Sequence, residues 1–250
     1  MRDFLVFQLY SPLASWGEVA VGEIRSTLSH PTKTAVLGLI ASALGVTRDA
    51  EELHRQLHLV LGYACWVVRK GETLRDYHTV QTPIRGNVEK RGEMLPWVRS
   101  RRDELLAGRP NTILSDREYR MDEAYVVALW QRSADAFISL GDISDALQRP
   151  TFVVFLGRKS CPLALPMSPS IIGSHSLLGA LRAYRPDQII VPETIDDRVF
   201  EVYWEELTGE DAEIPVSWEA TRYDLLLSRS RWQFGLRSEY AGTIESKQED

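Results

Sequence analysis

The sequence predicts an α+β protein with a ferredoxin-like βαββαβ core, an architecture that RNA-recognition modules also use. The order of the predicted elements indicates this fold class, and the length and composition set the size of its core. Strand-like and helix-like segments follow one another in the order β-α-β and then again β-α-β, and a long segment, 78–120, separates the two halves. The chain also has 250 residues, of which 44% are hydrophobic. That length and composition can form one substantial core or two small lobes.

The first half of the predicted core holds a strand, two helices and a second strand. Residues 4–10 form a short apolar run that ends before a serine and a proline, as a buried strand would. Residues 33–44 are apolar, with a proline shortly before them and a glycine just after, which is the usual asymmetry of a helix. Residues 49–57 predict a more polar helix, and residues 59–69 predict another buried strand.

The second half repeats this order and leads into a less regular C-terminal part. Residues 124–130 predict a strand, residues 143–147 the centre of a helix with Asp142 as its candidate N-cap, and residues 151–156 the fourth strand. A further helix is expected over 176–184, and further strands over 188–192, 198–206 and 223–228. We therefore expect a core over residues 1–160 and a β-rich extension, 161–250, packed on it.

Residues 79–118 are inserted between the second and third predicted strands. Such a connection usually has only a few residues, so its length indicates a functional role. The segment is rich in basic residues and interrupted by several prolines and glycines. We predict a projecting arm, a hairpin with a short helix near residues 97–106. The alternative is a disordered surface loop.

The charge of the chain is unevenly distributed. The net charge is −6 at pH 7, but residues 183–220 alone hold eleven acids and two arginines. By contrast, residues 85–120 hold nine Lys or Arg against six acids, and residues 222–237 hold four arginines and one acid. A chain with one acidic block and several basic ones can hold a polyanion on one face. The alternative is ordinary solvated surface charge.

The sequence also indicates where the protein resides. Its two cysteines, Cys65 and Cys161, do not make the disulfide framework of a secreted protein. The N-terminal apolar run is too short for a signal peptide, and no stretch approaches the roughly 20 apolar residues of a membrane helix. We therefore expect a cytoplasmic protein that does not associate with membranes.

A Lys-Thr pair opens the first predicted helix, as it does in nucleotide-binding loops. The glycines that would let the backbone wrap a nucleotide's phosphates are missing before Lys33, so we exclude a nucleotide loop. The free N–H groups of a helix start, together with Thr32, Lys33 and Thr34, could instead bind a single backbone phosphate. The alternative is an ordinary capped helix with an exposed lysine.

Histidines occur in two places that could carry chemistry. His54 and His58 are four residues apart and share one helix face, but no third ligand accompanies them, so we expect surface histidines and no metal. At the start of the arm, Tyr77 and His78 follow Arg75 and Asp76. Tyrosine, histidine and lysine can cleave RNA without a metal by acid–base chemistry, and they can equally contact an unpaired base. A metal-independent endoribonuclease using His78, Tyr77 and Lys33 is therefore an alternative.

Five segments together resemble one known family. They are "SPLASWG", "RSTLSHPTKTAVLGLIASALG", "LRDYHTV", "ILSDREYRMDEAYVVALW" and "FLGRKSCPL", and they span residues 4 to about 163 in a consistent order. This pattern resembles the CasD family of the RAMP superfamily, a subunit of the type I-E CRISPR surveillance complex called Cascade. Thr34 replaces the serine usual in that family and keeps the hydroxyl group.

The resemblance implies a specific role in antiviral defence. It implies a thumb between the second and third strands, and a non-catalytic subunit that binds the five-prime handle of the crRNA and caps the backbone filament. The implied partners are the crRNA, the backbone and large subunits, and target DNA through the assembled complex, without a cofactor. Because a related subfamily of another subtype cleaves precursor RNA, the resemblance leaves the endoribonuclease alternative open.

The third predicted strand lacks the aromatic pattern of RNA-recognition sheets, so we expect RNA along the loops and thumb rather than flat on the sheet. The candidate RNA-binding residues are Trp16, Arg25, Thr32, Lys33, Thr34, Arg75, Tyr77, His78, Arg85, Trp97, Arg117, Tyr119, Arg158, Lys159 and Ser160.

Overall fold

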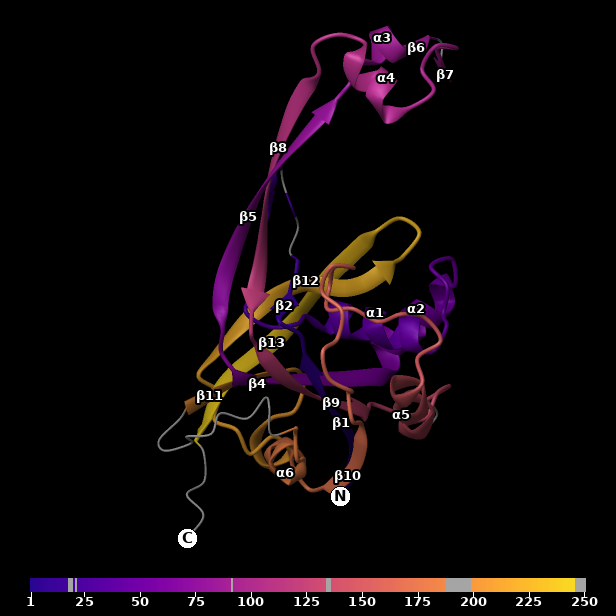
Figure 1. Ribbon diagram of the computed structural model, residues 1–250. Helices are drawn as coiled ribbons and strands as arrows, with labels where there is room; N and C mark the ends of the chain where they lie inside the picture. Colours follow the sequence, from indigo (N-terminus) through magenta and orange to yellow (C-terminus); the bar gives the residue numbers. More distant parts are fainter. Residues whose placement is uncertain (18–19, 21, 91, 134–135, 188–198, 246–250) are drawn as a thin grey trace.

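A computed structural model describes residues 1–17, 20, 22–90, 92–133, 136–187 and 199–245. The body of the molecule is one large sheet with helices on both faces, and a long two-stranded arm projects from it (Figure 1). This architecture confirms a mixed α/β protein with mostly sheet. No helix in the described part of the chain has the length and apolar character needed to span a bilayer.

The large sheet has seven strands, and every neighbouring pair is antiparallel. Their order is β10-β1-β9-β4-β11-β13-β12. The expected strands over residues 4–10, 59–69 and 124–130 are confirmed as β1, β4 and β9. The bounds are β1 (Arg2–Tyr10), β4 (Leu61–Arg69), β9 (Ala124–Gln131), β10 (Ser170–Ser174), β11 (Val199–Trp204), β12 (Trp218–Ser228) and β13 (Gln233–Glu245).

The central strands are buried on both faces, which explains why their sequences are continuously apolar rather than alternating. On β1, Leu5 and Phe7 belong to the core on one face, whereas Phe4 and Val6 belong to the core on the other. The first core is covered by α1 (Lys33–Ala43), α2 (Glu51–Val60) and α5 (Leu140–Gln148), and the second by α6 (Leu177–Ala183). The helices expected over residues 33–44, 49–57, 143–147 and 176–184 are therefore confirmed.

The N-cap of α5 differs from the expected one. Ser139 caps this helix by accepting a hydrogen bond from Asp142 N at 3.0 Å, and the Asp142 carboxylate accepts one from Ser139 N at 3.1 Å. Asp142 is therefore the third helical residue of a capping box, not the cap itself.

The prediction of a fourth core strand at residues 151–156 is wrong. The segment makes only an isolated bridge between Phe155 and Pro162, and Val153 is 83% exposed. Its first N–H groups, from Thr151 and Phe152, donate instead to the last carbonyls of α1. The last carbonyls of a helix lack the usual partners four residues on, and besides Gly45 N, which donates to Ser42, these N–H groups bind them, so the segment caps α1 instead of joining the sheet. The strand that pairs with β1 on the side away from β9 is β10.

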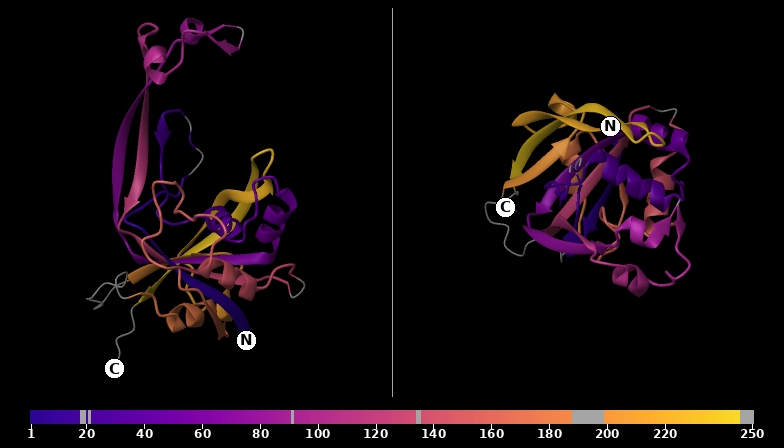
Figure 2. Two further views of the ribbon diagram at one scale, coloured as in Figure 1. Left: turned by 45° about the vertical axis from the view of Figure 1, so that its right-hand side comes forward. Right: turned by 90° about the horizontal axis from the view of Figure 1, so that it is seen from above.

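The arm is an antiparallel hairpin that stands well clear of the sheet (Figure 2). Its strands are β5 (Glu72–Thr82) and β8 (Asn111–Met121), and its tip carries α3 (Arg85–Val88), β6 (Glu89–Lys90), β7 (Glu93–Met94) and α4 (Arg101–Leu106). The helix expected near 97–106 is therefore shorter than predicted. At the base of the arm, β2 (Leu13–Ala14) and β3 (Ile24–Arg25) pair with β8.

The C-terminal part contributes strands to the same large sheet. The strands expected over residues 198–206 and 223–228 correspond to β11 and part of β12, with the short helix η1 (Gly209–Asp211) between them. The strand expected over residues 188–192 lies outside the described residues. β12 also contacts α1 and α2, so the β12–β13 hairpin borders these helices.

Candidate nucleic-acid interface

The lysine at the start of α1 is buried. Lys33 has no exposed surface, and its Nζ lies 2.6 Å from Oε1 of Glu205 and 3.1 Å from the backbone oxygen of His58. A buried ammonium group requires such partners, because burial removes the water that would solvate it. Burial lowers the pKa of Lys33 to about 8, although the charge of Glu205 acts in the opposite direction. The structure therefore corrects the expectation of a lysine exposed to a phosphate at the helix mouth.

The two threonines beside Lys33 also have partners within the protein. The Thr32 hydroxyl caps α1 by accepting a hydrogen bond from Ala35 N, 3.2 Å away. The Thr34 hydroxyl donates to the backbone oxygen of Asp224 on β12. The start of α1 is thus a capped helix end packed against the C-terminal hairpin, which agrees with the cap of the alternative interpretation but not with its exposed lysine.

Buried ion pairs surround this helix start. Arg132 Nη2 lies 2.8 Å from Oε1 of Glu205, so this carboxylate is shared between Arg132 and Lys33. On β13, Arg237 donates two hydrogen bonds to the carboxylate of Asp224, at 2.6 and 3.1 Å. These pairs link the start of α1 to strands that lie far from it in the sequence.

Glu239 on β13 extends the ion-pair network to the segment before α1. Its carboxylate accepts hydrogen bonds from Arg222 Nε at 2.7 Å and Arg237 Nη2 at 2.9 Å, and it lies 3.1 Å from His30 Nε2. Burial alone would raise the pKa of Glu239, but the hydrogen bond and charge of His30 and the nearby arginines lower it to about 2. Sequence reasoning missed this network because its members, such as His30 and Glu239, lie 209 positions apart.

The two histidines of α2 are buried, which corrects the expectation of surface histidines. His54 Nε2 lies 3.1 Å from the backbone oxygen of Thr47. His58 is 3% exposed, and burial, assisted by the charge of Lys33, lowers its pKa to about 3. Within the described ranges, no three His, Cys, Asp or Glu side chains are placed to hold a metal ion.

Arg158 joins three segments at the base of the arm. Its guanidinium donates to the backbone oxygens of Glu118 at 3.0 Å and Arg25 at 3.2 Å, and its Cζ lies 4.6 Å from the centre of the Tyr119 ring. This stacking is a cation–π contact, and it covers a tyrosine that is only 6% exposed. Arg158 therefore holds the loop after residue 157 against β3 and β8.

The three residues of the endoribonuclease alternative do not come together in the structure. Tyr77 and His78 are neighbours on β5, so their side chains leave opposite faces of the hairpin. Tyr77 is 61% exposed and is paired in register with Asp116, which forms an ion pair with Arg75. His78 forms its own contact with Asp76. Lys33, the third residue of that alternative, is buried in the body of the protein.

Three cations gather at the base of the arm; Arg25 and Lys159 are exposed, and Arg117 is half-buried. Arg25 on β3 lies beside Arg117 on β8, because these two residues are partners in the parallel pairing of the strands. Lys159 and Ser160 are exposed on the loop that Arg158 fixes to the backbone of Arg25. Among the described residues, no carboxylate forms an ion pair with Arg25, Arg117 or Lys159. The arm base therefore carries positive charge that the protein itself does not neutralise.

The other two expected aromatic contacts lie in different environments. Trp16 is 2% exposed, and its indole N–H donates to the hydroxyl of Tyr125 at 2.9 Å, so it belongs to the core. Trp97 lies at the tip of the arm and is 49% exposed. Arg85 is exposed at the start of α3, in the same tip. An eleven-residue antiparallel pairing separates the tip from the base, which corresponds to roughly 35 Å.

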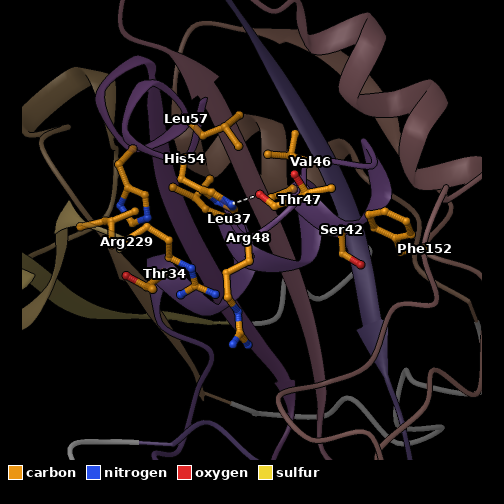
Figure 3. Close-up of a pocket in the computed structure, with 14 residues that line it drawn as sticks. Thr34, Leu37, Ser42, Val46, Thr47, Arg48, His54, Leu57, Phe152 and Arg229 are labelled. Atoms are coloured by element: carbon orange, nitrogen blue, oxygen red, sulfur yellow. Dashed lines mark hydrogen bonds between the residues drawn. The ribbon is translucent and has the colours of Figure 1, made fainter. Parts of the chain in front are cut away.

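A groove of about 850 Å³ begins next to the arm base and passes over α1. The loop after α5 and the β12–β13 hairpin form its walls, and its lining includes Ser15, Gly157, Val153, Tyr223 and Trp232. A smaller cavity of about 340 Å³ continues from it toward α2 (Figure 3). Both hollows share the lining residues Thr34, Gly38, Ser42, Arg48 and Arg229.

Sequence reasoning did not select the residues of this groove. The basic composition of residues 222–237 indicated a surface that can hold a polyanion, but composition does not show which arginines bind carboxylates inside the protein. Arg237 binds carboxylates of the buried network, Arg222 lines the groove but binds Glu239 of that network, and Arg229 lines the groove without forming an ion pair among the described residues. Arg48 lies in the turn between α1 and α2, where no motif marked it.

Comparison with known proteins identifies the family. The family described as CRISPR-associated protein (Cas_Cas5) matches residues 4–239. The chain belongs to this Cas5 family. It is 29% identical over 197 residues to the CRISPR system Cascade subunit CasD of Escherichia coli (strain K12), a match that covers 74% of this chain and 79% of the relative. The resemblance found in the five sequence segments is thereby confirmed.

Solved structures share the fold of the Cas5 chain. One chain of a "CRISPR RNA-guided surveillance complex" aligns with a TM-score of 0.62 and 22% identity, over 97% of this chain and 90% of that chain. A "Crystal structure of Cas protein" aligns with a TM-score of 0.57 and 22% identity, over 97% of this chain and 95% of that chain. At these identities the likeness concerns the fold.

The Cas5 chain distributes the residues expected to bind RNA over three places. Inside the protein, or engaged at the start of α1, are Trp16, Thr32, Lys33, Thr34 and Tyr119. At the base of the arm and along its lower strands are Arg25, Arg75, Tyr77, His78, Arg117, Arg158, Lys159 and Ser160. At the tip of the arm are Arg85 and Trp97.

Proposed function

We propose that this Cas5 chain is the non-catalytic subunit of a Cascade-type complex that binds the five-prime handle of the crRNA and caps the backbone filament. The observation that carries this proposal is a group of three cations around the base of a projecting arm, of which Arg25 and Lys159 are exposed and Arg117 is half-buried. Phosphates of single-stranded RNA favour such unneutralised charge, and a narrow arm can separate neighbouring bases.

The order of the strands supports a ferredoxin-like core with an inserted thumb. Strands β10-β1-β9-β4 have antiparallel neighbours, and helices connect β1 to β4 and β9 to β10. This order supports a ferredoxin-like core. The arm between β4 and β9 is then the thumb, including the residues 79–118 expected for it. Because β10 completes the four-stranded unit, the core extends beyond residue 160, and the remaining C-terminal strands form the extension packed on it.

The printed names of the relatives support the proposed partners. One relative is named a Cascade subunit and one matching structure is a chain of an RNA-guided surveillance complex. We propose that this chain assembles with a backbone subunit, a large subunit and crRNA, and meets target DNA through that assembly. The separation of Tyr77, His78 and Lys33 supports a subunit that does not cleave RNA.

A reconstitution experiment tests this proposal. Complexes assembled with the Arg117→Gln/Lys159→Gln variant should bind crRNA more weakly than complexes with the parent chain. Each lost phosphate contact should reduce the slope of log affinity against log salt by about 0.7. Arg2→Gln is the matched control, because Arg2 is exposed at the start of β1, on a different element from the arm.

Two outcomes would contradict the proposal. Equal affinity and equal salt dependence for the parent and the double variant would remove the arm base from the RNA interface. Defined cleavage of repeat RNA by the isolated chain in EDTA, lost in His78→Ala, would establish the endoribonuclease instead.

A further inference from the structure

Two arginines face the same part of the groove over α1. Arg48 lies in the turn after α1 and is exposed, and Arg229 lies near the end of the β12–β13 hairpin. Both line the groove and the smaller cavity that continues from it. In Figure 3 their side chains extend into the same part of this cavity, beside Thr34. The two cations therefore come from elements that are distant in sequence and meet over one helix.

The protein does not neutralise these two charges. Among the described residues, neither Arg48 nor Arg229 forms an ion pair, and the buried Nε of Arg229 has no hydrogen-bond partner. The carboxylates nearest in sequence are engaged elsewhere. Asp49 interacts with Thr47, and Glu51 accepts a hydrogen bond from Ser228 at 2.6 Å.

The position of Arg229 is held by an aromatic ring. Its Cζ lies 4.2 Å from the ring centre of Trp232, which in turn packs edge-on against Phe234 with 5.5 Å between the centroids. Burial and the nearby charge of Arg48 both lower the pKa of Arg229. Two like charges held in one hollow repel each other, and an anion placed between them would remove this repulsion.

The walls of the groove suit a chain rather than an isolated ion. Trp232 is 59% exposed, Tyr223 is 58% exposed, and Val153 on the opposite segment is 83% exposed. Asp224 is the one carboxylate among the lining residues, and Arg237 binds it with two hydrogen bonds. The groove thus combines free positive charge with planar rings, the two features that bind phosphates and bases of single strands.

We propose that Arg48 and Arg229 clamp one phosphate of a single-stranded RNA that lies in the groove over α1. The groove begins at Ser15 and Gly157, next to the cations of the arm base, so one strand can pass from the arm to this clamp. The inference rests on the proposed RNA-binding function and extends the interface by a site that sequence reasoning did not select.

The test measures binding of a fluorescein-labelled single-stranded RNA of repeat sequence to the full chain over a salt series. Arg48→Gln should weaken binding about tenfold at low salt and reduce the salt slope by about 0.7, as expected for one lost phosphate contact. Arg48 makes no hydrogen bond within the described part of the protein, so its loss should not affect folding. Arg229→Gln should have a similar effect, and the double variant little more, because both arginines hold the same phosphate.

Arg231→Gln is the matched control for this clamp. Arg231 lies two residues from Arg229 on the same hairpin, is exposed, and does not line the groove. The inference alone is overturned if the parent chain binds RNA and the Arg48→Gln/Arg229→Gln variant binds it with unchanged affinity and salt slope. Absence of RNA binding by the parent chain, both alone and in the reconstituted complex, would overturn the proposed function and the clamp with it.

A second measurement locates the RNA directly. RNA containing 4-thiouridine should crosslink to a peptide that includes Arg229 and Trp232, as well as to peptides of the arm. Crosslinks confined to the arm would contradict a strand in the groove, while still supporting RNA binding by this chain. The crosslink to the hairpin should weaken in Arg48→Gln and persist in Arg231→Gln.

Discussion

Nζ of Lys33 lies 2.6 Å from a carboxylate oxygen of Glu205, across 172 positions of sequence. One residue opens α1, and the other directly follows β11 in the C-terminal part of the chain. Both side chains are almost fully buried. The pair therefore fixes the start of a core helix to the strands that extend the sheet, and it removes Lys33 from any contact with solvent.

Replacing Lys33 should destabilise the protein without changing RNA contacts. Lys33→Met leaves the buried carboxylate of Glu205 with fewer partners, and breaking a buried ion pair costs about 3 kcal/mol. Urea unfolding should show this loss in the free energy of unfolding. The salt slope of RNA binding by the folded variant should remain that of the parent chain, because a buried ammonium contacts no phosphate.

A double-mutant cycle checks the origin of that loss. If the pair itself is responsible, Lys33→Met/Glu205→Gln should be less destabilised than the sum of the two single variants. Additive losses would show that the two side chains act independently. A reduced salt slope in Lys33→Met would return Lys33 to the RNA interface.

His58 should make the protein sensitive to acid. Its pKa is lowered to about 3 in the folded protein by burial, whereas an unfolded histidine titrates near 6.5. Between these values the unfolded chain binds more protons, so stability falls as the pH decreases below about 6.5. The contribution of neutral His58 to the free energy of unfolding is complete above about pH 6.5. Between about pH 6.5 and pH 3 the free energy of unfolding falls by about 1.4 kcal/mol per pH unit.

Unfolding experiments at pH 7 and pH 5 check this dependence. His58→Phe should lose less stability between the two pH values than the parent chain, because it has no imidazole to protonate. His175→Gln provides the control, since His175 is exposed and should leave the difference unchanged. An equal acid sensitivity of His58→Phe and the parent would assign the effect to other groups.

The sequence predicted those parts of the fold that depend on local pattern. The apolar runs of β1, β4 and β9 and the bounded helix α1 are recognisable because burial on two faces and helix ends leave local signals. Residues 151–156 have the composition of a strand, but the α1 carbonyls of Ser42 and Ala43 provide partners for their N–H groups. These hydrogen bonds form only in the tertiary structure, so the composition of residues 151–156 does not reveal them.

The candidate site was predicted only where its residues are local in sequence. The "LRDYHTV" segment and the loop at Arg158 were found, because each is a short motif beside the arm. Lys33 was misplaced, since its partner Glu205 is remote. The arginines of the groove were missed because Arg48 and Arg229 meet only after folding. Charge composition identified the basic segments but not which of their arginines bind carboxylates.

Gly157 should tolerate no side chain. Its φ angle is +85°, and a Cβ placed on it would lie 1.8 Å from the backbone oxygen of Ser15. Gly157→Ala should therefore destabilise the protein by about 3 kcal/mol in urea unfolding, because the clash adds to the strain of the left-handed backbone. Because Arg158 follows directly, its stacking on Tyr119 should also be disturbed.

A second glycine separates the clash from the backbone strain. Gly22 has a φ angle of +71°, but no atom lies within 4 Å of a Cβ built on it. Gly22→Ala should destabilise the protein by only about 1 kcal/mol, the contribution of the left-handed conformation. Similar losses in the two variants would mean that the loop at residue 157 moves to accept a side chain.

Trp97 at the tip of the arm tests whether the whole arm contacts RNA. The ring is half exposed, and a base stacked on it would contribute about 1–3 kcal/mol of binding free energy. Trp97→Ala should therefore weaken RNA binding by about tenfold or more in reconstituted complexes. Its urea unfolding should match the parent chain, because an exposed side chain contributes little to the core.

Leu106→Ala is the control for this prediction, since Leu106 is 72% exposed at the same tip and has no aromatic ring. It removes apolar surface and should leave RNA affinity unchanged, with the salt slope identical in all three proteins because neither side chain is charged. Equal losses in both variants would indicate a protein partner that packs against the apolar tip. Unchanged affinity in Trp97→Ala would confine the RNA to the base of the arm.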